Sequence, residues 1–177
     1  MLDISVAYNR YKFLGYEFLT WLWYITATGA WPANQPQIET ARLAVGNRIV
    51  LQNHTTAAME TVTIKGDEAD LKEGLLALRK GALVSEISLV LSTSELEYSF
   101  VLKGESLCLS GLKLPVLAQI EDDQSADAAI LEKIYLIEAL SVMLEAFYHT
   151  YLDQRLSPYW GSHLLPDMSA WAAKTDQ

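Results

Sequence analysis

Half of the aromatic residues of this chain lie within its first 31 positions, and most of them fall in one apolar segment. Within residues 11–28, apolar residues recur at the three- and four-residue spacing of one helix face: Leu14, Phe18, Trp21, Leu22 and Ile25. Gly29 and Pro32 then supply the signals that end a helix. The aromatic side chains point in all directions around this helix, which predicts that more than one of its faces packs against protein.

Alternating segments after this helix predict a sheet. Gln37–Val45 alternates between polar and apolar residues, and Gly46-Asn47 is a turn signal. Arg48–Gln52 is therefore expected to return as the second arm of a hairpin. Glu60–Lys65 alternates cleanly and is rich in β-branched residues, which favours a further strand.

Three more extended segments lie in the middle of the chain. Leu83–Ser92 and Leu96–Leu102 are expected to form a hairpin, and Leu107–Leu109 reads as a short strand or extended segment. Short hairpin links favour antiparallel pairing. The expected fold is a single α+β domain over residues 1–177, with a mainly antiparallel sheet of about five strands packed against helices.

Two further helices are expected. The middle helix opens at Gly66-Asp67 and stops at Gly81. The last major helix covers about Ala126–Leu156, and its apolar residues nearly encircle it. Such a helix is expected to be mostly enclosed, either across the sheet or at an oligomer contact. A short closing helix is expected at Leu164–Lys174.

Charge and composition narrow the classes of partner. The net charge is −9, and the region from Pro115 to Gln177 carries ten acids and three bases. Such an acidic surface repels phosphate and weighs against direct nucleic-acid binding. The apolar stretch Phe13–Thr28 is too short to cross a bilayer, and the start of the chain lacks a secretory signal pattern, so a cytoplasmic location away from membranes is expected.

Few residues suggest chemistry. Glu138, Glu145 and His149 share one stripe of the long helix, which leaves a metal-dependent hydrolase as the weaker alternative; a solvent-facing stripe is the favoured interpretation. Cys108, the single cysteine, is expected to be a small buried hydrophobe. The sequence lacks the phosphate-binding glycine motifs and the G-x-S-x-G nucleophile motif. We therefore expect a protein that is not an enzyme and needs no cofactor.

Two sets of residues are candidates for contacts with other molecules. The excess of aromatic residues predicts an interaction surface for a protein partner or a homo-oligomer, made by Tyr16, Trp21, Trp23, Tyr24 and Trp31. Direct DNA binding through the basic N-terminal end is the alternative, and its weaker candidates are Arg10, Lys12, Arg42 and Arg48.

The run FLGYEFLTWLW, residues 13–23, resembles a phrase of the form FLGxEFLTWLW in the longer bacterial recombination-associated proteins of the RdgC type. Further segments are similar and occur in the same order: Val62–Gly66, Leu71, Ala77–Arg79, Lys113–Pro115, Ile134–Glu138 and Arg155–Trp160. The resemblance covers the C-terminal portion of those proteins. Members of that family bind DNA as a ring-shaped dimer and restrain recombinase activity.

The resemblance implies an accessory module of recombination rather than a DNA-gripping protein. The main DNA-encircling part of the family lies outside the similar region, and no basic DNA-facing surface matches here. No DNA-binding residue is therefore carried over, and any link to nucleic acid is expected to be indirect, through protein contacts.

Overall fold

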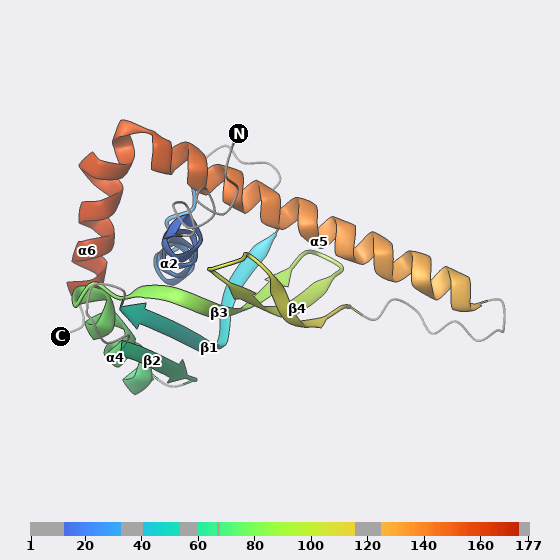
Figure 1. Ribbon diagram of the computed structural model, residues 1–177. Coiled ribbons are helices and arrows are strands. Elements are labelled where there is room, and N and C mark those ends of the chain that lie inside the picture. Colours follow the sequence, from blue (N-terminus) through green and yellow to red (C-terminus); the bar gives the residue numbers. More distant parts are fainter. Residues whose placement is uncertain (1–12, 33–40, 54–59, 67, 116–124, 174–177) are drawn as a thin grey trace, which may run out of the picture.

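In a computed structural model, residues 13–32, 41–53, 60–66, 68–115 and 125–173 are described. Five strands form one antiparallel sheet in the order β2-β1-β3-β4-β5. Their bounds are β1 Arg42–Asn53, β2 Glu60–Lys65, β3 Leu83–Ser92, β4 Glu97–Lys103 and β5 Leu109–Lys113. The helices are α2 Phe13–Thr28, α4 Glu68–Arg79, α5 Ser125–Leu156 and α6 Leu165–Ala173, with a π-helix, η1, at Trp160–Leu164. The predicted α+β architecture is confirmed (Figure 1).

Helix α2 is the centre of the core. Its buried residues include every position from Phe18 to Ile25, so the predicted contact on several faces is confirmed. Gly15 allows the start of α2 to approach the chain closely, because a Cβ there would collide with the backbone carbonyl of Gly104. The glycine in FLGYEFLTWLW therefore has a packing role, between a helix and the turn after β4.

The predicted hairpin at Gly46-Asn47 is wrong, because β1 runs without interruption from Arg42 to Asn53. Val45 pairs with Leu89 and Ile49 with Ile87, so the β1 segment between these pairs is longer than the β3 segment it faces. The turn signal forms a bulge, which accommodates the extra residues. Gly46 fits there because a Cβ would lie 2.5 Å from the hydroxyl of Ser88.

The β1–β3 pairing has a second irregularity, between Val50 and Leu51. A side chain of α2 forms a hydrogen bond with β3 at this point. The amide of Val84 donates a hydrogen bond of 3.0 Å to the hydroxyl of Thr20, which in turn donates one of 2.8 Å to the carbonyl of Tyr16. A buried amide without a partner is costly, so this hydroxyl supplies the acceptor that the Val84 amide needs. It also fixes α2 on the sheet.

The segment after β4 differs from the prediction. Leu107 has a φ of 53°, a left-handed conformation that a strand does not use, and β5 begins only at Leu109. Cys108 is exposed rather than buried, so the expectation of a small buried hydrophobe is wrong.

The predicted middle and closing helices are confirmed as α4 and α6. Gly81, with a φ of 88°, follows α4 as predicted, whereas Asp67, the expected cap, lies outside the described residues. Trp171 of α6 lies edge-on against Trp23 at 5.2 Å, so α6 closes the core over α2.

The long helix α5 has two different halves. Phe147 and Tyr151 in its C-terminal half are buried, and Figure 1 shows its N-terminal half extending past the edge of the sheet. In that half Ile130, Leu131 and Ile134 are exposed. Enclosure across the sheet is therefore not found for the N-terminal half, and the expected alternative, an oligomer contact, stays a prediction.

Candidate interaction surface

The predicted aromatic interaction surface lies mostly inside the protein. Trp21 and Trp23 are at most 1% exposed, and Tyr16 and Tyr24 are also buried. Trp31 is partly buried and lies 5.7 Å from Phe147, measured between ring centroids. These side chains pack the core because α2 crosses between the sheet and the helices at the C-terminal end. They offer little area to a partner, so an exposed surface has to be sought elsewhere.

The rings of α2 and α5 form an aromatic cluster. Phe18 contacts Tyr148 edge-on at 5.0 Å and Tyr151 at 5.4 Å, and Trp21 lies 5.8 Å from Tyr151. The indole nitrogen of Trp21 donates a hydrogen bond of 2.8 Å to the side-chain oxygen of Gln154. Such edge-on and tilted contacts add to the free energy gained by burying the rings. The cluster joins α2 to the C-terminal half of α5.

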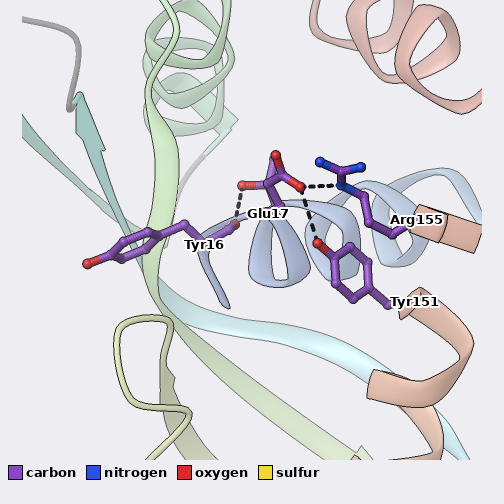
Figure 2. A network of polar contacts seen from close by, with 5 residues as sticks. Tyr16, Glu17, Tyr151 and Arg155 are labelled. Carbon is purple, nitrogen blue, oxygen red and sulfur yellow. Dashed lines mark hydrogen bonds and ion pairs between the residues drawn. The ribbon is translucent and has the colours of Figure 1, made fainter. Parts of the chain in front are cut away.

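A polar network at the rim of this cluster is the first candidate for chemistry (Figure 2). Arg155 donates a hydrogen bond of 2.6 Å from Nε to Oε2 of Glu17, and the Tyr151 hydroxyl donates one of 3.3 Å to the same oxygen. The Arg155 guanidinium also lies 5.3 Å from the ring centroid of Trp160. Every member therefore contacts another member, as in a structural clamp.

The pKa values of Tyr151 and Arg155 are those expected of groups that hold their protons in a structural clamp. Burial, followed by the negative charge of Glu17, raises the pKa of Tyr151 far above its ordinary value. The hydrogen bond to Glu17 raises the pKa of Arg155 as well. A neutral tyrosine and a charged arginine thus share one carboxylate oxygen at neutral pH, and neither readily releases its proton.

The basic candidates for DNA contact are dispersed. Arg42 and Arg48 are both exposed on β1, on a single strand rather than on the two arms of a hairpin. Arg48 forms an ion pair of 3.5 Å with Glu86, which neutralises its charge locally. Arg10 and Lys12 lie outside the described residues.

The candidates for a metal-dependent hydrolase all lie on one helix. Glu138, Glu145 and His149 are exposed on α5. Within the described ranges, no group of three histidine, cysteine or acidic side chains is placed to hold a metal ion. The facing carboxylate–histidine pair that a di-metal site uses is thus not found in this part of the chain.

Two hollows are lined mainly by apolar residues. One, of about 400 Å³, lies between α2 and the β1 bulge and includes Trp23, Leu43 and Ile49. The other, of about 510 Å³, lies between the end of α4 and α6 and includes Met168 and Trp171. Among the described residues, neither lining contains a carboxylate, a histidine or a cysteine, which acid–base or nucleophilic catalysis would need.

Among the described residues, the largest group of exposed apolar side chains lies on the N-terminal half of α5 and the first residues of its C-terminal half. We define the α5 outer face by its members: Ile130, Leu131, Ile134, Tyr135, Ile137 and Val142. Their exposed fractions run from 42% for Ile137 to 66% for Leu131, whereas Leu136 and Leu140 on the other side of the helix are buried. Exposed apolar side chains that gather on one face in this way often mark a site of interaction with another molecule.

The sequence pattern indicated that this side of α5 is apolar, but it predicted that the helix is enclosed. Apolar residues nearly encircle α5, and a helix of that kind requires a cover on every side. The sheet and α2 cover one side of it in this structure. The remaining side is the candidate interaction surface.

Comparison with protein-family models, with curated proteins and with solved structures gave no match. None of the helices in the described part of the chain has the length and apolar character that a membrane-spanning helix needs. The structure thus defines an α+β protein with an unpartnered helical face.

Proposed function

We propose that this protein is a non-enzymatic accessory module of DNA recombination that acts through protein–protein contacts made by the α5 outer face. The observation that carries the proposal is the exposure of six large apolar side chains on a helix that extends past the sheet. The link to recombination is supported by the resemblance of FLGYEFLTWLW to RdgC-type proteins.

The physical reason for a contact function is the cost of exposed apolar surface. Removing apolar area from water contributes about 25 cal/mol per Å². A standard protein–protein interface buries about 800 Å² per partner, and the α5 outer face supplies six large apolar side chains toward such an area. A folded partner that covers this face therefore gains a substantial part of the free energy that association requires.

Catalysis has less support than contact. The half-buried charged residues Glu17 and Arg155 are paired with each other, and the two hollows lined mainly by apolar residues lack acid–base side chains. A third hollow, lined in part by Glu60, Glu73 and Lys80, has a volume of only about 100 Å³. The basic residues Arg42 and Arg48 are separated by the β1 bulge, and Arg48 is neutralised by Glu86.

A recombinase strand-exchange assay with added protein tests the proposal. The wild-type chain is expected to change the rate of exchange, and Ile134→Ser is expected to abolish the change because it places a hydroxyl in the middle of the α5 outer face. Leu76→Ser is the matched control, since Leu76 is an exposed leucine on a different helix, α4. Equal activity of wild type and Ile134→Ser, or no effect of the wild-type chain, would contradict the proposal.

A further inference from the structure

We propose that the occupant of the α5 outer face is a basic amphipathic helix of another protein, with two Lys or Arg residues about eleven positions apart and apolar residues between them. This inference rests on the proposed contact function and specifies its partner. It follows from the charges that lie along the face and from the register that a second copy would require.

Acidic residues lie in line with the apolar members of the face. Asp127, Glu138 and Glu145 are exposed on the same side of α5 as Ile134. They fall seven residues before it, four after it and eleven after it, spacings that return to the same side of a helix. Between Asp127 and Glu138, apolar side chains thus occupy the middle of a stripe that has a carboxylate at each end, and Glu145 lies further along the same line.

The single base in this stretch lies on a flank. Lys133 is exposed and stands one turn from Ile130 and Ile137. It is not in line with Glu138, which follows Ile134 and Tyr135 by one turn. The charge that a helix meets along the centre of the face is therefore negative.

A second copy does not complement that pattern when the pair is parallel and in register, or antiparallel and centred on Ile134. A parallel pair in register places Glu138 against Glu138 and Asp127 against Asp127. An antiparallel pair centred on Ile134 places each Glu138 over Ile130 of the other copy, where the carboxylate is covered by apolar surface without a cation. Each copy also carries a net charge of −9, which adds to the repulsion.

A basic helix complements the pattern in either direction. Asp127 and Glu138 are eleven residues apart, which is about 16 Å along the axis at 1.5 Å per residue. A partner helix with two bases at the same separation can pair with both carboxylates, while its apolar residues at i, i+3, i+4 and i+7 pack on Ile130, Ile134 and Ile137. The charges fix the register, and the apolar residues supply the area.

A peptide-display selection on the intact chain tests the inference. The probe is a library of 18-residue helical peptides with apolar residues fixed at i, i+3, i+4 and i+7 and with two flanking positions, eleven residues apart, randomised. The expected result is enrichment of Lys or Arg at both randomised positions. Selection on the Glu138→Lys variant is expected to replace one of these bases with an acid.

Affinity measurements sharpen the test. An enriched peptide is expected to bind Glu138→Lys roughly five- to tenfold more weakly than wild type, and more weakly as salt is raised. Glu95→Lys, which makes the same charge change at an exposed position in the β3–β4 connection, is expected to leave the affinity unchanged. Enrichment of neutral or acidic residues, or equal affinity for both variants, overturns the inference.

Light scattering separates this inference from the proposed function. A wild-type dimer that becomes a monomer in Ile134→Ser identifies a second copy as the occupant, which overturns the basic-helix inference but supports a contact function. Absence of both self-association and peptide enrichment overturns the basic-helix inference, and the strand-exchange assay then decides the proposed function by itself.

Discussion

The two halves of α5 are made of similar residues but lie in different surroundings. Tyr151 in the C-terminal half is 0% exposed and contacts rings of α2 and η1, whereas Tyr135 in the N-terminal half is 64% exposed. The C-terminal half packs across α2, and the N-terminal half extends past the sheet (Figure 1). An apolar residue thus stabilises the fold only where another element reaches it.

The comparison also separates two uses of aromatic and aliphatic residues. In the C-terminal half they hold α2 in place through close ring contacts and a clamp of hydrogen bonds. On the α5 outer face they contribute little to the stability of the isolated chain, and their exposure leaves them available to a partner, whereas Leu136 and Leu140 on the opposite side are buried. Substitutions in the two halves should therefore differ in kind as well as in size.

The largest effect is expected from Trp21→Ala. The indole of Trp21 is fully buried and donates a hydrogen bond to Gln154. Its removal should therefore lower the free energy of unfolding by about 3–5 kcal/mol. Tyr135→Ala removes an exposed ring from the other half and should change that free energy by less than about 0.5 kcal/mol. Chemical denaturation followed by circular dichroism measures both, and equal losses would remove the distinction between the halves.

A smaller effect is expected from Gly15→Ala, which tests how closely α2 is held. The added methyl group meets the carbonyl of Gly104, so the substitution should cost about 1–3 kcal/mol despite the better helix propensity of alanine. Gly161→Ala is the matched control, because a Cβ there meets nothing within 4 Å. A stabilising Gly15→Ala would show that α2 packs less tightly than the structure indicates.

The next effect depends on pH. Because the pKa of Tyr151 is raised in the folded state, the unfolded chain loses this proton first, above a pH of about 10. The stability is complete below that pH and should then fall by about 1.4 kcal/mol per pH unit for this group. Tyr24, Tyr98 and Tyr148 also have raised pKa values and contribute to the total slope.

The share of Tyr151 is isolated by Tyr151→Phe, which should give a shallower decline between pH 10 and 11. Urea unfolding at a series of pH values measures the two slopes. Parallel curves for wild type and variant would place the Tyr151 hydroxyl in water rather than in the cluster.

The smallest effect on stability is expected from Ile134→Ser, within about 0.5 kcal/mol of wild type, because the side chain is 47% exposed. The same substitution is expected to have the largest effect on association. Denaturation and binding measured on one preparation test this reversal. A loss of several kcal/mol would instead assign Ile134 to the fold.

Local patterns predicted most of the elements. Helical spacing placed α2, start and stop residues placed α4, alternation placed β2, and two extended segments joined by a short link placed β3 and β4. Gly46-Asn47 was misinterpreted because a hairpin and a bulge use the same turn residues. Only the pairing of both flanking segments with β3 distinguishes them.

The candidate site was harder to predict than the fold. An apolar pattern shows that a residue needs cover, and it does not show which element provides the cover. Trp21 and Trp23 were therefore predicted to contact a partner, but they are buried in the core. Ile130 and Ile134 belong to a helix that was predicted to be enclosed, but they are exposed. Cys108 was misplaced for a related reason, since the left-handed backbone at Leu107 interrupts the expected strand.

The continuity of α5 has a mechanical consequence. Ile130 and Tyr151 are joined by an unbroken helix about 32 Å long. A displacement of its outer end is therefore expected to be transmitted along the helix to the crossing with α2. A partner bound at the outer end would thereby change the packing of the rings around Trp21 and Trp160. The intrinsic fluorescence of these indoles is therefore expected to change when a partner binds at the N-terminal end of α5.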